Sequence, residues 1–331
     1  MKLFTHLLTF FILTALANPL FAQTNDPLPS WNEGEVKSKI IDFVHKVTTK
    51  ASPDYVAPSK RIATFDNDGT LWVEYPTYTQ VLFAFDRVKE LAPLHPEWKT
   101  KQPFKALLEG DMKTVGKSGM KGLVEILMAT HSGMSADAFN AQSAKWLKST
   151  KNPHFKHLYM ELVYQPQLEL LHYLRANGFK TFIVSGGGVA FMRSVSQEVY
   201  GIPPYQVIGS SIVSKYQKVN GKNELIRLPK INFINDEAGK PVGIYNHIGQ
   251  RPIFAFGNSD HDMEMIEYTK EGKGLTLALF VHHTDASREF AYDRKSHVGT
   301  LDKALDLAKK EDWIIVDMKK DWKLIFPFDL K

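Results

Sequence analysis

The chain has 331 residues, 44% hydrophobic and 23% charged, and these globular proportions exclude a disordered or collagen-like protein. The formal net charge is +5 at pH 7 without a run of Lys and Arg, so composition does not favour a nucleic-acid binder, which concentrates basic residues on one face or tail. The chain has no cysteine, which excludes disulfides, cysteine zinc sites and thiol catalysis.

The first 22 residues have the pattern of a secretory signal peptide. Lys2 precedes an apolar stretch over residues 3–17, and Ala22 ends a typical cleavage site. A membrane anchor is the alternative interpretation, but the stretch is shorter than the ~20 residues needed to span a bilayer. We therefore expect residues 1–22 to be removed and the mature protein to be periplasmic or secreted, with no attachment to the membrane.

The rest of the chain divides into a part with helices alone and parts in which strands and helices alternate. Residues 23–60 form a lead with one helix, over residues 36–48, and a short β-rich run over residues 61–65 comes next. Apolar residues at helical spacing, without a strand signal, predict an inserted helical cap over residues 73–160. Strands alternate with helices again over residues 161–331, where strands are expected at 179–184, 206–209, 252–256, 275–281 and 313–318. A helix is expected over residues 189–200, and the polar, mixed residues 211–244 suggest a β-hairpin with loops. Together with residues 61–72, this part predicts an α/β core built on a parallel sheet.

Three of the predicted strands end in polar loops that contain glycine, at residues 66–70, 185–188 and 257–262. The carboxyl ends of parallel strands lie at one edge of a sheet, so these loops are expected to converge. Asp66 and Asp68 point the same way on an extended segment, and their repulsion favours a cation between them. One carboxylate can then act as a nucleophile and the other as a proton carrier.

These loops carry a resemblance to a known family. Asp66-Asn67-Asp68-Gly69-Thr70 resembles the first motif of the haloacid dehalogenase (HAD) superfamily phosphatases, and Ser185 matches the second motif. Lys240 matches the motif lysine, and Gly257-Asn258-Ser259-Asp260-His261-Asp262 resembles the fourth motif. The resemblance covers roughly residues 60–290 and favours the phosphoserine-phosphatase-like or secreted acid-phosphatase-like branch. It implies a Rossmann-like sheet with a cap inserted after the first motif.

The resemblance also implies roles. Asp66 would form an aspartyl-phosphate, Asp68 would act as general acid and base, and Lys240 would neutralise the developing charge. The presence of Asp68 indicates a phosphatase, because the dehalogenases of the superfamily lack an acid there. The phosphate of a small phosphorylated substrate would be bound by Thr70, Ser185, Gly186 and Gly187. A Mg²⁺ ion would be held by Asp66, the main-chain carbonyl of Asp68, Asn258 and Asp262.

Two departures from the family pattern leave alternatives open. Asn258 stands where the fourth motif has an acid, which removes a charge from the metal site, and Asp260 could compensate. Lys230 competes with Lys240 for the role of motif lysine. We also consider a catalytically impaired phosphoester-binding protein, and a serine hydrolase that uses Ser185 with a histidine such as His282.

Other residues are less informative. His282, His283 and Asp285 could bind substrate or a second metal, but an ordinary polar loop is the simpler interpretation. Residues just after the first motif, such as Trp72 and Glu74, are expected mostly to pack or to act as a hinge, while some select the substrate. The sequence indicates neither the natural substrate nor an oligomeric state.

Overall fold

The computed structural model describes residues 26–330, so the predicted signal peptide lies outside the described residues. Its framework is a sheet with the strand order β4-β3-β2-β1-β5-β6-β7, in which β8 pairs with β6. The strands are β1 (Ile62–Phe65), β2 (Lys180–Gly188), β3 (Val207–Val219), β4 (Lys222–Phe233), β5 (Phe254–Gly257), β6 (Leu277–Thr284), β7 (Ala291–Tyr292) and β8 (Ile314–Asp317). The central pairs are parallel, and the β3–β4 and β6–β7 pairs are antiparallel. The predicted α/β class with a parallel core sheet is confirmed.

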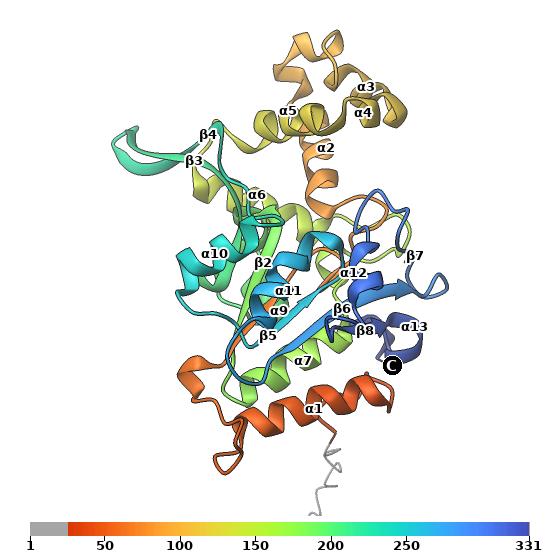
Figure 1. Ribbon diagram of the computed structural model, residues 1–331. Helices are drawn as coiled ribbons and strands as arrows, with labels where there is room; N and C mark the ends of the chain where they lie inside the picture. Colours follow the sequence, from red (N-terminus) through yellow and green to blue (C-terminus); the bar gives the residue numbers. More distant parts are fainter. Residues whose placement is uncertain (1–25, 331) are drawn as a thin grey trace, which may run out of the picture.

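Helices cover both faces of this sheet (Figure 1). The α-helices are α1 (Glu35–Thr48), α2 (Thr79–Leu91), α3 (Phe104–Glu109), α4 (Met112–Lys117), α5 (Gly119–His131), α6 (Ala136–Ser149), α7 (Gln165–Ala176), α8 (Val189–Arg193), α9 (Ser196–Tyr200), α10 (Gly239–Ile248), α11 (Met263–Lys270), α12 (Lys303–Leu307) and α13 (Met318–Asp321). Alternate strand residues face opposite sides. Phe65 and Phe256 pack in one apolar core with α1 and α7, while Ile62 and Ala255 pack in a second core with α10 and α11. The sheet is therefore buried on both faces, which fixes the position of its edge loops.

Residues 79–149 contain α2 to α6 and no strand of the sheet. Helices α2 to α5 extend away from the sheet, at the top of Figure 1. Val88 of α2, Trp98, Phe104 of α3 and Ile126 of α5 belong to a third apolar cluster, separate from the two cores beside the sheet. Helix α6 instead buries its apolar side chains in the larger sheet core. The cap boundaries that we place at residues 73 and 160 stay predictions.

The structure differs from the sequence expectations between residues 189 and 248. The helix expected over 189–200 is broken into α8 and α9, and Ser194 Oγ at the break donates to the Phe191 carbonyl, 2.7 Å away. A backbone-directed hydroxyl of this kind competes with helix continuation. The strand expected over 206–209 extends to Val219 and pairs with β4, so the hairpin suggested for residues 211–244 is present but begins within that longer strand. Helix α10, expected as part of a mixed loop region, carries Lys240.

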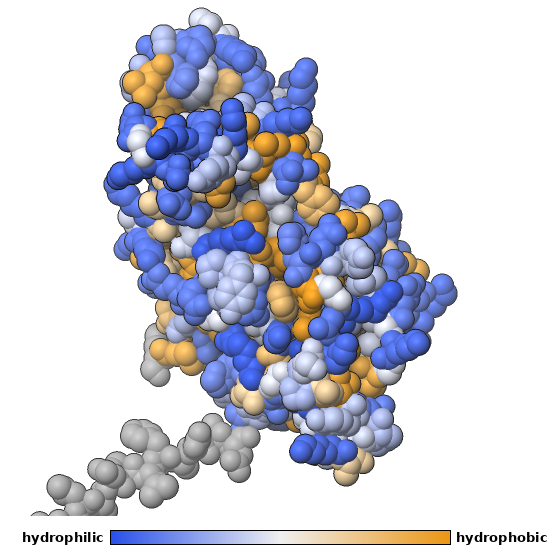
Figure 2. Space-filling model, turned by 90° about the vertical axis from the view of Figure 1, so that its left-hand side faces the viewer, coloured by the Kyte–Doolittle hydropathy of each residue, from blue (hydrophilic) through white to orange (hydrophobic). Residues whose placement is uncertain are grey.

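The molecular surface is mostly hydrophilic on the face that Figure 2 shows, with apolar surface gathered toward the middle of the molecule. Within residues 26–330, no helix combines the length and the apolar character needed to cross a membrane.

Candidate active site

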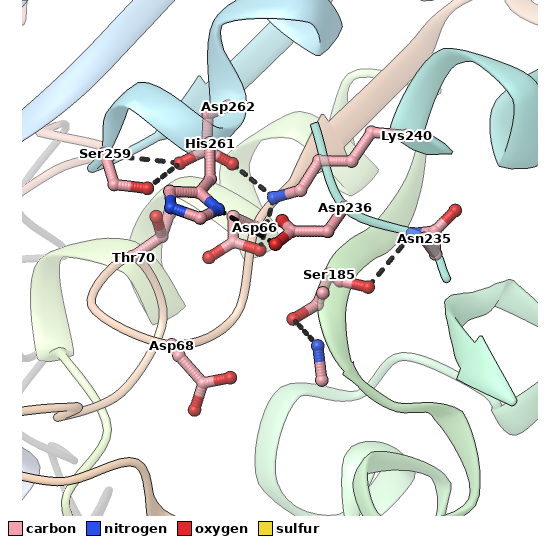
Figure 3. Close-up of polar contacts among 12 residues, drawn as sticks. Asp66, Asp68, Thr70, Ser185, Asn235, Asp236, Lys240, Ser259, His261 and Asp262 are labelled. Carbon is pink, nitrogen blue, oxygen red and sulfur yellow. Dashed lines mark hydrogen bonds and ion pairs between the residues drawn. The ribbon is translucent and has the colours of Figure 1, made fainter. Parts of the chain in front are cut away.

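Neighbouring strands β2, β1 and β5 bring the three predicted loops to one edge of the sheet. Asp66 directly follows β1, Ser185 lies within β2, and Asn258 directly follows β5. β1 is the parallel neighbour of both β2 and β5. The expected convergence is therefore observed, and Figure 3 shows the residues of the three loops around one centre.

Asp66 is buried at this centre, where Lys240 from α10 reaches it. Lys240 Nζ lies 2.8 Å from Asp66 Oδ1 and also contacts Asp262 Oδ1 (Figure 3). The side chain of Lys240 is only 2% exposed. Lys230 lies exposed on β4, so the geometry favours Lys240 as the motif lysine.

The charges of this buried group depend on one another. Burial lowers the pKa of Lys240, but the carboxylates of Asp262 and Asp66 outweigh that effect, and the pKa is raised above its ordinary value. Lys240 is therefore cationic at neutral pH. Burial raises the pKa of Asp66, and repulsion from Asp262 and Asp68 adds to this rise, while Lys240 opposes it. A cation beside Asp66 would favour its ionised form.

Asp68 faces the same centre but has different partners. Its Oδ1 accepts a hydrogen bond from Trp72 Nε1 at 2.7 Å. A Cβ built on Gly187 would lie 3.2 Å from Asp68 Oδ2, which places this oxygen beside the loop that follows Ser185. Burial raises the pKa of Asp68 to about 6, although the Trp72 hydrogen bond and Lys240 lower it. A carboxyl group that titrates near neutral pH is suited to carrying a proton.

The tight turn after Asp68 depends on Gly69. Its φ of +72° is in the left-handed region, which glycine adopts without strain. A Cβ at this position would overlap the side chains of Asn258 and Glu74. The first motif therefore needs glycine both for the turn and for the close approach of these two side chains.

The three glycines after Ser185 were expected in a loop, but they continue β2 to Gly188 past a shift in its pairing register with β3. Protein groups hold this segment in place. Ser185 Oγ accepts from the Gly187 amide at 3.1 Å, and Asn235 Nδ2 donates to the Ser185 carbonyl at 3.0 Å. Gln80 Oε1, from α2, accepts from the Gly188 amide at 2.7 Å. Sequence reasoning missed Gln80 and Asn235, since both are distant in sequence from the motif that they contact. No histidine among residues 26–330 forms a hydrogen bond with Ser185 Oγ, so the structure does not favour the serine hydrolase alternative.

Asn258 is buried, and both ends of its side-chain amide have a polar partner. Thr70 Oγ1 donates to Asn258 Oδ1 at 3.1 Å, and Asn258 Nδ2 donates to Glu74 Oε1 at 2.6 Å. Glu74 is itself 2% exposed and also accepts from Tyr292 Oη at 3.0 Å. Burial, followed by repulsion from Asp68 and Asp66, raises the pKa of Glu74 well above its usual range. Glu74 was expected to be a packing, hinge or substrate-selecting residue, and the structure places it against the fourth motif.

The oxygen atoms around Asp66 fit a hard divalent cation such as Mg²⁺. Among the described residues, Asp66 Oδ2 and the main-chain oxygen of Asp68 accept no hydrogen bond, and Asn258 Oδ1 accepts one. Residues 26–330 contain no group of three or more His, Cys, Asp or Glu side chains arranged to hold a metal. The ligands named here are consistent with that, because only Asp66 contributes a carboxylate, while Asn258 contributes an amide oxygen and Asp68 a main-chain oxygen. Both oxygens of Asp262 already have protein partners, namely Lys240 and the amides of Asn258 and Ser259. A role of Asp262 as a metal ligand stays a prediction.

The remaining predicted residues lie around this centre. Asp260 accepts from the amides of Asp302, Lys303 and Ala304, so its carboxylate caps the start of α12. His261 Nδ1 lies 2.8 Å from Asp236 Oδ2, and this hydrogen bond raises the pKa of His261 to about 9, against the effect of burial.

His282 and His283 lie within β6, which extends to Thr284, and not in a polar loop as expected, while Asp285 directly follows the strand. All three residues make structural contacts. His283 Nε2 lies 2.8 Å from the carbonyl of Gly69, and its Nδ1 lies 3.1 Å from Glu289. His282 lies 3.4 Å from Asp293, and Asp285 accepts hydrogen bonds from Ser287 and Arg288. His283 thus holds the turn of the first motif in place through the Gly69 carbonyl.

Comparisons with known proteins give a family match and matches to solved structures. The sequence model of haloacid dehalogenase-like hydrolases matches residues 63–267, which is more than half of the chain. A conserved protein of unknown function from Anaerococcus prevotii has a similar fold, with a TM-score of 0.53 and 16% identity over 78% of this chain and 89% of that chain. A phosphoserine phosphohydrolase-like protein from Francisella tularensis matches with a TM-score of 0.39 and 15% identity over 79% of this chain and 97% of that chain. No curated protein matches the sequence significantly.

The chain therefore belongs to the haloacid dehalogenase-like hydrolases. The acid at Asp68 is the feature by which the family resemblance indicates a phosphatase rather than a dehalogenase.

Proposed function

We propose that the protein is an exported, magnesium-dependent phosphomonoesterase that acts on a small phosphorylated metabolite through an aspartyl-phosphate on Asp66. The observation that carries the proposal is the buried Asp66–Lys240 pair at 2.8 Å, with Asp68 and Ser185 on either side. A carboxylate beside a fixed cation can approach a phosphate dianion, because the cation offsets their repulsion. Asp66, the Asp68 carbonyl and Asn258 would hold Mg²⁺, which supplies further positive charge to the phosphoryl group.

Two displacements at phosphorus complete the reaction. A carboxylate oxygen of Asp66 attacks phosphorus and the bond to the leaving oxygen breaks, while Asp68 donates a proton to that oxygen. Asp68, now ionised, takes a proton from water as the water oxygen attacks phosphorus. The bond to Asp66 breaks, inorganic phosphate leaves, and both carboxyl groups return to their starting states.

The helical part beside the site suits an enzyme that must exclude water from the first displacement. Gln80 on α2 contacts the amide of Gly188, so α2 and the phosphate-binding loop are linked directly. Export is supported by the signal-like pattern of residues 1–22, and fractionation of cells that produce the full chain tests it. Recovery of a full-length product in the cytoplasm would contradict export.

Hydrolysis of p-nitrophenyl phosphate by residues 23–331, with and without Mg²⁺, tests the proposed activity. We expect turnover that requires the metal and is lost in Asp66→Asn, a variant of equal size. Phosphate binding without turnover would contradict the proposal and favour the impaired binding protein, for which Asn258 is the supporting observation.

A further inference from the structure

In the buried contact between Asn258 and Glu74, the acidic side chain of Glu74 has no cationic partner within the described part of the chain. A carboxylate taken out of water costs several kcal/mol unless it is paired with a cation or fully hydrogen-bonded. Glu74 Oε1 accepts from Asn258 Nδ2 and Tyr292 Oη, two neutral donors. Among the described residues Glu74 forms no ion pair, and its Oε2 accepts no hydrogen bond. The protein itself therefore supplies no cation to this carboxylate.

Glycines at two positions leave space for the Glu74 side chain. A Cβ on Gly69 or on Gly299 would overlap Glu74 Oε1, and both glycines have positive φ, +72° and +57°. Two segments far apart in the sequence thus leave room for this one side chain. Neighbouring Asp68 and Asp66 add negative charge rather than neutralising it. Burial of a third acid at this place fits a site that binds a cation.

The same contact fixes the orientation of the Asn258 amide. Glu74 Oε1 accepts a hydrogen bond from Asn258 Nδ2 at 2.6 Å, so the amide turns its NH₂ group toward Glu74. Its oxygen, Oδ1, then faces Thr70 Oγ1, the donor at 3.1 Å, and keeps a second lone pair for a cation. Without Glu74, either end of the amide could face Thr70, because a hydroxyl both donates and accepts.

We propose that Glu74 is the carboxylate of the cation site: it supplies the charge that Asn258 lacks and holds the Asn258 oxygen toward the cation. The acid that the fourth motif has lost is thereby replaced from a different segment, eight residues after the nucleophile. Glu74 is a positioning residue in this account, with Tyr292 holding it from the other side. The inference rests on the proposed magnesium-dependent function.

Calorimetric titration of Mg²⁺ into the metal-free protein tests the assignment without relying on turnover. Four proteins are compared: wild type, Glu74→Gln, Asn258→Asp and the double variant, which moves the carboxylate from position 74 to position 258. We expect Glu74→Gln to weaken Mg²⁺ binding by roughly 10- to 100-fold, as the loss of groups that support metal ligands does. The double variant should recover most of the affinity, because the same total charge surrounds the cation. Glu169→Gln is the control, since this carboxylate binds Ser30 on the far side of the sheet core.

Stability measurements separate a charge role from a packing role. Asn258→Asp places two carboxylates in contact, so its metal-free form should melt at a lower temperature and Mg²⁺ should raise that temperature more than in wild type. Wild-type affinity in Glu74→Gln, or a double variant that binds no better than Glu74→Gln, would overturn the assignment while leaving the phosphatase function intact. A wild-type protein that binds no Mg²⁺ and still hydrolyses p-nitrophenyl phosphate would overturn both the metal dependence and the role of Glu74.

Discussion

Lys240 Nζ lies between the carboxylates of Asp66 and Asp262, 2.8 Å from the first and in contact with the second. The lysine comes from α10 and the two acids from the loops after β1 and β5, so this contact joins three separate segments. Because both acids are buried, removing the lysine leaves negative charge with no compensating cation from the protein. The charge at Asp66 and the stability of the fold are therefore coupled through one side chain.

Replacement of Lys240 by Met should destabilise the protein and abolish its activity. Breaking a buried ion pair by removing one partner costs about 3–5 kcal/mol, and the loss should be smaller at acidic pH, where the carboxylates take up protons. Urea unfolding at pH 5 and pH 7.5, together with phosphatase assays, measures both effects. Lys230→Met, on exposed β4, is the matched control and should resemble wild type. Equal activity loss in both variants would contradict the role assigned to Lys240.

Asp68→Asn should separate the two proton transfers. p-Nitrophenolate leaves without a proton, whereas an alkyl alkoxide needs one, so the first step should slow more for alkyl phosphates, by about 10²- to 10⁴-fold. The second step should slow for every substrate, since Asp68 also activates water. Stopped-flow measurements should then show a burst of about one p-nitrophenol per active site, a stoichiometry expected for a covalent intermediate that accumulates. Equal slowing with aryl and alkyl substrates, and no burst, would argue that Asp68 carries no proton.

The contact between Gln80 and Gly188 should affect substrate binding more than chemistry. Gln80→Met keeps the size of the side chain but leaves the Gly188 amide without its acceptor. A lost hydrogen bond of this kind costs about 1 kcal/mol, so KM should rise about fivefold while kcat changes less. Gln102→Met removes a similar side-chain bond, to Ala106 in the helical part, and serves as the control. An unchanged KM in Gln80→Met would show that α2 and the phosphate-binding loop act independently.

His131 should make the protein less stable in acid. Burial, with smaller effects of Arg227 and Arg87, lowers the pKa of His131 to about 3 from 6.5. Between these two values the unfolded chain binds a proton there and the folded chain does not, so the free energy of unfolding falls as the pH falls below 6.5. This contribution to stability is fully present above pH 6.5.

Replacing His131 with Phe should remove that dependence. The slope of unfolding free energy against pH should decrease by up to about 1.4 kcal/mol per unit between pH 6 and pH 4. Denaturant unfolding at a series of pH values checks this, with the exposed His172→Gln as control. A wild-type slope in His131→Phe would mean that other groups cause the acid sensitivity.

Much of the site could be predicted because its residues follow strands and recur in a fixed order. Asp66, Ser185 and Asn258 follow or lie within buried β-runs, and parallel strands place such positions at one edge. The position of Lys240 on a helix was harder to predict, because Gly239-Lys240-Pro241 has the composition of a loop. Pro241 is the third residue of α10, and proline is tolerated in the first turn of a helix.

Glu74, Gln80 and Asn235 could not be predicted because no local pattern marks them. Each reaches the site by folding back from another element, and their contacts span 184, 108 and 50 residues of sequence. The length of β3 was missed for a related reason. Its outer half is polar and exposed, so it lacks the alternation that indicates a half-buried strand, and pairing with β4 is what holds it extended.

Acid quenching during turnover, followed by mass spectrometry of the peptide that carries Asp66, tests the central claim most directly. The account predicts one phosphoryl group on Asp66, accumulating in Asp68→Asn and absent from Asp66→Asn. A phosphoryl group on Ser185, or turnover with no modified residue at all, would contradict a mechanism through Asp66.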